Sequence, residues 1–237
     1  MRPVRLNLAM ASLFAVGSTC FALGSVPTYA TAVGATADSV TFFVGSLFFT
    51  AASSLQLVQA QTPAMTGADG RTQHLRSQLV LGAWLPHDRA WLSAAVQFPG
   101  TLFFNVSTFA ALVHNATLQQ QDRHVWRPDL FGSILFLAAS VLALLAARSM
   151  KAGPSRTWTL AIGWINMAGS ALFMASALAS FVLPSTGGLI DLPVAVGGTF
   201  LGALCFLVGA LLLLPAWRAA VAVAPRAFHP IETRSPT

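Results

Sequence analysis

Five polar residues lie within or at the ends of long apolar stretches, where burying a polar group is costly. They are Gln97, Asn105, Asp129, Asn166 and Thr199. In apolar helices such residues mark ligand sites or interhelical hydrogen bonds. All except Asn105 stand three residues before a glycine. That glycine begins a nine-residue phrase, described below, which recurs in every long apolar stretch. We expect them either to converge on one polar cluster or to fix the register of neighbouring helices.

No catalytic motif accompanies these residues. The chain has no GxSxG, HExxH or Walker phrase and no paired carboxylates. The two cysteines, Cys20 and Cys205, lie in separate apolar stretches, which excludes a disulfide framework and indicates no metal site. No charged residue lies at the middle of an apolar stretch, which disfavours ion-coupled transport. We therefore expect no enzymatic activity, no cofactor and no metal.

Long apolar stretches must position the polar residues. The chain is 55% hydrophobic and 8% charged, with a mean hydropathy of +0.69, whereas a soluble domain carries about 25% charged residues. A spanning helix needs about 20 apolar residues. Six stretches qualify, and they predict helices over 6–28, 38–59, 91–114, 129–147, 157–183 and 193–217. The predicted fold class is all-α, a single polytopic transmembrane bundle over residues 1–217 with a disordered tail at 218–237.

The connections between these helices are expected to be loops. Segments 26–37 and 115–128 are predicted on one side of the membrane, and 60–89 is the longest polar segment. Its part at 74–86 fits either an amphipathic surface helix or a loop tucked under the bundle. Asp129 directly follows the loop 115–128, so its carboxylate is expected to cap the next helix.

The basic residues are divided unevenly between the two sides. Of the 13 Lys and Arg residues, 11 fall on the side of the chain termini and only Arg123 and Arg127 on the other. The positive-inside rule then predicts a multi-pass cell-membrane protein with both termini in the cytoplasm. A signal peptide is the alternative for the first stretch, because Arg2 and Arg5 precede an apolar run. The run is longer than the apolar region of a signal peptide, which usually has about 7–15 residues, and this favours a membrane helix.

One phrase recurs in every apolar stretch and is clearest as GSILFLAAS at 132–140. It has a glycine, then a small residue, a phenylalanine four positions after the glycine, and two small residues that close it. Because a helix turns about 100° per residue, the glycine, the phenylalanine and the first closing residue share one face. The pairs are Gly17 and Phe21, Gly45 and Phe49, Gly100 and Phe104, Gly132 and Phe136, Gly169 and Phe173, and Gly202 and Phe206.

The phrase predicts how the helices pack. Small residues let backbones approach closely, and we expect each phenylalanine to fill the space that a glycine opens on a neighbour. Ser and Thr at the second and ninth places can hydrogen-bond across helices, worth about 0.6 kcal/mol each. The spacing favours three hairpin repeats, with the first helix paired to the second, the third to the fourth and the fifth to the sixth. A ligand-lining role for the same face is the alternative.

Two segments carry a family resemblance. Residues 91–112, WLSAAVQFPGTLFFNVSTFAAL, and 126–143, WRPDLFGSILFLAASVLA, resemble the YrhK-like membrane proteins. That small bacterial family has paired helices with similar Gly-Ser or Gly-Thr and Phe phrases, and the resemblance is strongest over about residues 84–181. It implies a bacterial inner-membrane location. It implies no catalytic residues, because the family has no established activity.

Two functional hypotheses remain open. The first is a small-solute binding or passage protein with Gln97, Asn105, Asn166 and Thr199 around a central polar site. The second is a non-transporting structural or interaction protein whose repeats serve packing and oligomerisation. The bilayer is the expected partner in both, and a homo-oligomer and an unnamed small ligand are allowed. Nucleic acid is not expected, because the basic residues are scattered over short loops.

Overall fold

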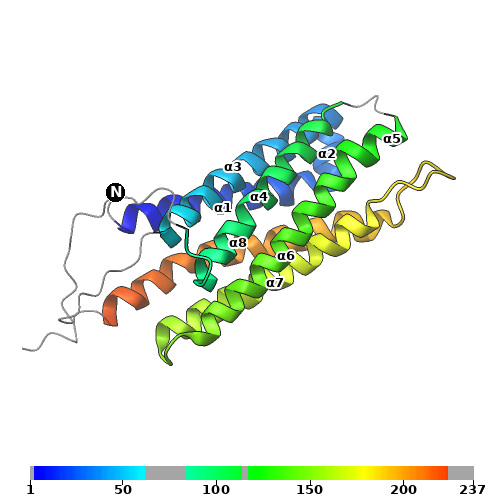
Figure 1. Ribbon diagram of the computed structural model, residues 1–237. Helices are drawn as coiled ribbons and strands as arrows, with labels where there is room; N and C mark the ends of the chain where they lie inside the picture. Colours follow the sequence, from blue (N-terminus) through cyan, green and yellow to red (C-terminus); the bar gives the residue numbers. More distant parts are fainter. Residues whose placement is uncertain (1–2, 62–83, 114–116, 224–237) are drawn as a thin grey trace, which may run out of the picture.

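A computed structural model describes residues 3–61, 84–113 and 117–223 of the chain. The described part is helical and contains no β-strand, which confirms the all-α prediction (Figure 1). Within it, the helices of 22 or more residues are α1 (Pro3–Gly24), α3 (Ala35–Gln61), α4 (Arg89–Ala110), α6 (Arg127–Ser149), α7 (Pro154–Ala179) and α8 (Leu192–Val223).

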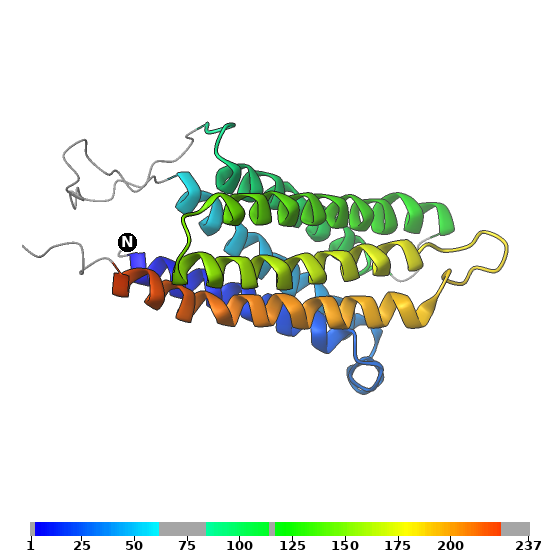
Figure 2. The same cartoon turned by 90° about the horizontal axis from the view of Figure 1, so that it is seen from below.

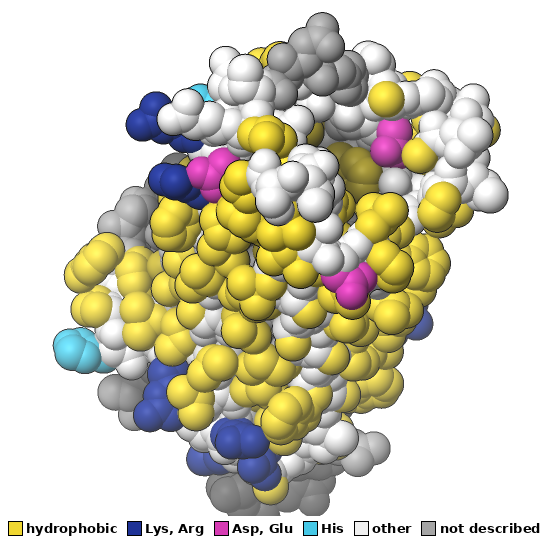
Figure 3. All heavy atoms as spheres, turned by 90° about the vertical axis from the view of Figure 1, so that its right-hand side faces the viewer, with side chains coloured by type: hydrophobic (Ala, Val, Ile, Leu, Met, Phe, Trp, Pro, Cys, Tyr) yellow, Lys and Arg dark blue, Asp and Glu magenta, His cyan; other side chains and the backbone are white. Residues whose placement is uncertain are grey.

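Several of these helices are long and apolar enough to cross a membrane. The stretches are Arg5–Gly24, Ala35–Gln61, Leu118–Ser149, Pro154–Ala179 and Leu192–Ala216. α4 is not among them, because Gln97 and Asn105 lower the mean hydropathy of its apolar part. Hydrophobic side chains cover the middle of the face shown in Figure 3, and most charged ones lie towards its two ends. This is the construction of a multi-pass membrane protein.

The six long helices close into a ring. Each packs along the helix that precedes and follows it in the chain, and α8 packs along α1. Consecutive helices run in opposite directions, so the bundle has two distinct ends (Figures 1 and 2). An α-helix pairs its backbone N–H and C=O groups within itself, as a lipid environment requires. Pro99 of α4 and Pro215 of α8 are exceptions, because proline has no N–H to donate.

The two ends differ in charge. We call one the basic end; it holds the starts of α1 and α4, the α6–α7 turn and the last part of α8 (Figure 2). Its described basic residues are Arg5, Arg89, Arg148, Lys151, Arg156 and Arg218. We call the other the loop end; it holds the connections from α1 to α3, from α4 to α6 and from α7 to α8. Only Arg123 and Arg127 are basic among the described residues there.

The connection before α6 corrects the prediction of a loop at 115–128. A short α5 (Leu118–Gln120) and a π-helix, η1 (Gln121–Trp126), run directly into α6. A capping box starts the run: the Thr117 hydroxyl accepts the Gln120 N–H at 3.3 Å, and the Gln120 amide oxygen accepts the Thr117 N–H at 2.9 Å. Pro128 has no N–H to donate, and the π-helical turn before it is the distortion that carries the helix past it.

Other helix limits also differ from the prediction. α1 ends at Gly24, and the predicted loop 26–37 contains the short helix α2 (Pro27–Val33), because Pro27 disfavours continuation of α1 and suits a first helical turn. Gly34 has a φ of +83°, which lets the chain turn from α2 into α3. α4 ends at Ala110, short of the predicted 114.

The tail prediction is wrong for its first part. Residues 218–223 continue α8, which ends at Val223. The rest of the predicted tail, 224–237, lies outside the described residues, and so does most of the candidate amphipathic segment at 74–86.

Candidate functional site

Each glycine of the recurring phrase lies against the phenylalanine of the helix paired with it. A methyl group built on Gly100 would stand 3.0 Å from the Phe136 ring, and one on Gly132 would stand 2.8 Å from the Phe104 ring. The same reciprocal contact joins α1 to α3 and α7 to α8. It involves Gly17 with Phe49, Gly45 with Phe21, Gly169 with Phe206 and Gly202 with Phe173. The glycines therefore allow the aromatic rings to enter the bundle.

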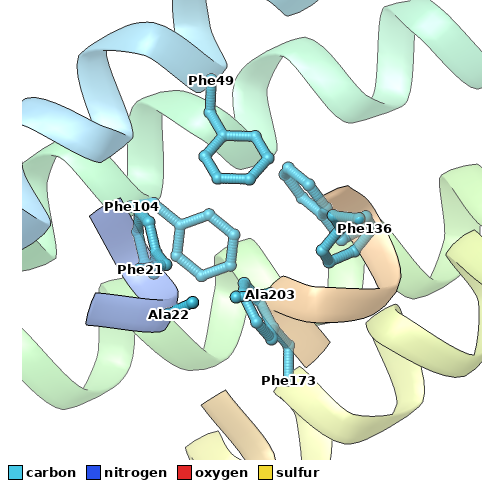
Figure 4. Packing of buried hydrophobic residues seen from close by; sticks show 8 residues of the cluster. Phe21, Ala22, Phe49, Phe104, Phe136, Phe173 and Ala203 are labelled. Carbon is cyan, nitrogen blue, oxygen red and sulfur yellow. The ribbon is translucent and has the colours of Figure 1, made fainter. Parts of the chain in front are cut away.

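The six phenylalanines meet at the centre of the ring in two layers (Figure 4). Phe21, Phe104 and Phe173 form the loop-side layer, with ring centroids 5.9–6.5 Å apart. The second, basic-side layer has centroids 5.7–6.3 Å apart and consists of Phe49, Phe136 and Phe206. Most of these contacts are edge-to-face, the arrangement that aromatic quadrupoles favour. The layers fill the axis of the bundle with apolar side chains.

A cavity of about 230 Å³ lies against the basic-side layer, among all six long helices. It reaches towards the basic end as far as Gln59, near the end of α3, and Thr159, near the start of α7. Among the residues that the structure describes, its lining mixes apolar side chains with neutral polar ones and includes no charged one. The polar lining residues are Gln56, Gln59, Ser93, Gln97, Ser140, Thr159 and Asn166.

The amides of Gln97 and Asn166 face this cavity from α4 and α7. Asn166 is held closely, because its Oδ1 lies against Gly209 of α8, where a methyl group would collide with it. The Ser140 hydroxyl, hydrogen-bonded to the Ser170 hydroxyl at 2.8 Å, supports the same wall. At the outer part of the cavity, Gln59 Nε2 donates to Asn7 Oδ1 at 3.0 Å and ties α3 to α1. Amides can donate and accept hydrogen bonds, so the site suits an uncharged polar group.

The other predicted polar residues do not join this pair. Asn105 Nδ2 donates to the Thr50 hydroxyl of α3 at 2.9 Å, and the Thr199 hydroxyl shares a 2.7 Å hydrogen bond with Ser176 of α7. Both are interhelical hydrogen bonds that fix register, which was one of the two expectations.

The directions of the helices explain why the predicted polar residues do not all form one cluster. A residue three places before the glycine lies on the basic side of the phenylalanine layers in α4 and α7, which run towards the loop end. The same place in α6 and α8 lies on the loop side, because these helices run the other way. Gln97 and Asn166 therefore line the same cavity, whereas Asp129 and Thr199 lie on the other side of the layers.

Asp129 lies at the loop end, in a separate pocket lined also by Trp126 and Ser180. The predicted capping role is wrong. The residue before α6, Trp126, is itself helical, with φ −66° and ψ −49°, and no side chain caps α6. Asp129 instead stands inside a continuous helical run that starts at Leu118.

Two glycines of the cavity wall were not predicted from the sequence. Gly163 and Gly209 leave room for Leu144 and Asn166, respectively. Gly209 is a closing residue of the phrase in α8, so the sequence predicts that it lies on the packing face. The sequence does not predict its contact with the Asn166 amide.

Comparison of the chain with protein-family models, with curated proteins and with solved structures found no match.

Proposed function

We propose that this protein is a six-span inner-membrane bundle of three hairpin repeats that binds a small, uncharged, amide-bearing solute from the cytoplasmic side. The observation that carries the proposal is the cavity of about 230 Å³ with the Gln97 and Asn166 amides on its wall and phenylalanine rings at its inner end. An apolar cavity of about 150 Å³ holds benzene. The proposed ligand is therefore somewhat larger than benzene.

The chemistry of the lining sets the ligand class. Without a charged side chain in the wall, an ionic ligand would lose its hydration and gain no counter-ion. A primary amide can exchange hydrogen bonds with Gln97 and Asn166, and an attached apolar group can rest on Phe49, Phe136 and Phe206.

The orientation and the span count are part of the proposal. The basic end faces the cytoplasm because it carries most of the basic residues. α4 is the sixth span in spite of its lower hydropathy, because its polar residues Gln97 and Asn105 lie against the cavity and against α3 rather than lipid. The resemblance to YrhK-like membrane proteins stays a prediction.

Binding rather than passage is the proposed role, because the two phenylalanine layers fill the axis beyond the cavity. The same observation favours the second candidate function, a non-transporting protein whose centre serves only to hold the helices together. The two candidates differ in whether the cavity takes up a solute.

Thermal unfolding of the purified full-length protein in nanodiscs separates them. Benzamide is the first probe, with benzoate as its charged counterpart. We expect benzamide to raise Tm and benzoate not to, since a ligand at 100 times its Kd adds about 2.7 kcal/mol to stability. Benzamide should not raise the Tm of Gln97→Leu or Asn166→Leu. It should still raise the Tm of Asn105→Leu, because Asn105 lies outside the cavity lining.

Proteoliposome flux of benzamide should stay at background. A shift with benzoate equal to that with benzamide, or one that survives Gln97→Leu and Asn166→Leu together, contradicts the proposed site. If benzamide and related neutral amides leave Tm unchanged, the structural role is supported instead.

A further inference from the structure

A second pocket, at the loop end, has different chemistry from the central cavity. It has a volume of about 350 Å³ and lies between the ends of α4, η1, the start of α6 and the α7–α8 connection. Its polar residues are Gln121, Asp129 and Ser180. The rest of its wall is apolar and consists of Ala111, Val113, Val125, Trp126, Val182 and Leu189.

The Asp129 carboxylate has no structural task in this pocket. In residues 3–61, 84–113 and 117–223, no hydrogen bond or ion pair joins it to another side chain or to a backbone N–H. Arg127, the basic residue nearest to Asp129 in sequence, forms an ion pair with Asp122 instead, and its Nη2 lies 2.8 Å from Asp122 Oδ2. An ionisable group within a membrane bundle is costly, so a carboxylate without a compensating partner is a functional pointer.

We propose that this pocket binds a small organic ammonium ion with an apolar substituent, and that Asp129 is its counter-ion. The carboxylate accepts the N⁺–H groups, and the Ser180 hydroxyl oxygen is a further acceptor beside it. The ring of apolar side chains receives the substituent. A hard inorganic cation such as Ca²⁺ takes six to eight oxygen ligands, more than this lining offers.

The wall of the pocket is held in place by contacts to two other helices. The Ser107 hydroxyl of α4 donates to the Val125 carbonyl of η1 at 2.8 Å. Trp126 Nε1 donates to the Ala177 carbonyl of α7 at 2.8 Å, and its ring meets Phe181 edge-on at 4.8 Å. These contacts fix η1 beside Asp129, and short π-helical segments of this kind are frequent at functional sites.

This pocket is independent of the proposed amide site. It shares no lining residue with the central cavity, and the two phenylalanine layers lie between them. Failure of one proposal therefore leaves the other standing.

Isothermal titration of the full-length protein in nanodiscs with benzylammonium tests the inference. Benzyl alcohol is the neutral isostere, and Asp88→Asn is the control variant because Asp88 caps α4 at the opposite end and Asn caps equally well. We expect wild type and Asp88→Asn to bind benzylammonium alike. Benzyl alcohol, and benzylammonium with Asp129→Asn, should bind at least tenfold more weakly.

A second variant keeps the test decisive if Asp129→Asn fails to fold. Val182→Trp fills the pocket from the α7–α8 connection and leaves Asp129 in place, and it should abolish binding. Equal affinity for benzyl alcohol, unchanged binding by Asp129→Asn or Val182→Trp, or no heat with wild type at millimolar benzylammonium overturns the inference. Competition by sodium at equal concentration also overturns it, since it identifies an inorganic cation site.

Discussion

At the scale of single residues, the place three residues before each glycine of the phrase carries the variation between helices. It holds Phe14, Phe42, Gln97, Asp129, Asn166 and Thr199. In three helices this residue lies against a small residue of the paired helix: Phe42 against Gly24, Asn166 against Gly209 and Thr199 against Ser176. Phe14 instead meets the Phe49 ring edge-on. The glycine and the phenylalanine are the same in every copy and pack against each other, whereas the copies differ in residue type at this place.

Two glycines of α8 give a matched test of the packing at the centre. A methyl group on Gly202 would collide with the Phe173 ring, whereas one on Gly197 would meet no atom within 4 Å. We expect Gly202→Ala to lower the free energy of unfolding by about 1–3 kcal/mol, as overpacking does. Gly197→Ala should leave it unchanged or raise it by up to about 1 kcal/mol, because alanine favours a helix. Thermal unfolding in nanodiscs measures both, and equal effects would argue against the ring contacts.

Part of the site was predictable from residue type alone. Gln97 and Asn166 were found because amides are rare in apolar helices, and they do share a cavity. The wider convergence failed because the helices of each hairpin run antiparallel, so the same place in the phrase alternates between the two ends of the bundle from one helix to the next. Gly163 was not predicted because a glycine outside the recurring phrase gives no sign in the sequence that it leaves room for Leu144 in the cavity wall.

At the scale of helices, hydroxyl groups join neighbouring hairpins at the second and ninth places of the phrase. Ser46 of α3 pairs with Thr108 of α4 at 2.9 Å, and Ser140 of α6 pairs with Ser170 of α7 at 2.8 Å. The corresponding places between α8 and α1 hold Ala210 and Ser18. The Ser18 hydroxyl is buried without a hydrogen-bond partner among the described residues.

This difference predicts a stabilising substitution. Ala210→Ser supplies the absent hydroxyl between α8 and α1, and we expect a gain of about 0.6 kcal/mol, the average for interhelical hydrogen bonds in a membrane. The gain should vanish when Ser18→Ala is also present. A double-mutant cycle of unfolding free energies measures the coupling, and an equal gain in both backgrounds would assign it to something other than this pair.

Helix limits were harder to predict than helix existence. The polar residues Asp122, Arg123 and His124 suggested a loop, yet they belong to η1, where the capping box at Thr117 begins a helix before the apolar run. Apolar periodicity indicates which residues of a helix meet lipid. It does not indicate where the backbone hydrogen bonds of that helix stop.

At the scale of the whole molecule, all six glycine–phenylalanine faces point inward and are occupied within the chain. The phrase therefore has no free copy left to join a second molecule. An oligomer would have to use the outward faces, which carry exposed apolar residues such as Val106, Phe131 and Leu211.

The proposed topology predicts which residues water reaches from each side. In a protein without its native cysteines, His87→Cys and Gln119→Cys flank α4 at exposed positions. In spheroplasts, a membrane-impermeant thiol reagent should label Gln119→Cys at once and His87→Cys only after permeabilisation. Gln97→Cys should follow His87→Cys, because the cavity extends towards the basic end. Labelling of both flanking positions from the same side would show that α4 does not cross the membrane.

The contact between α8 and α1 has a consequence for how the chain encodes the fold. Because the last helix packs along the first, the order of helices around the ring has no physical starting point. Three helical hairpins that meet in this way are arranged like three subunits of a cyclic trimer joined by linkers. The packing around the ring would therefore be the same if a different one of the six connections were the open one.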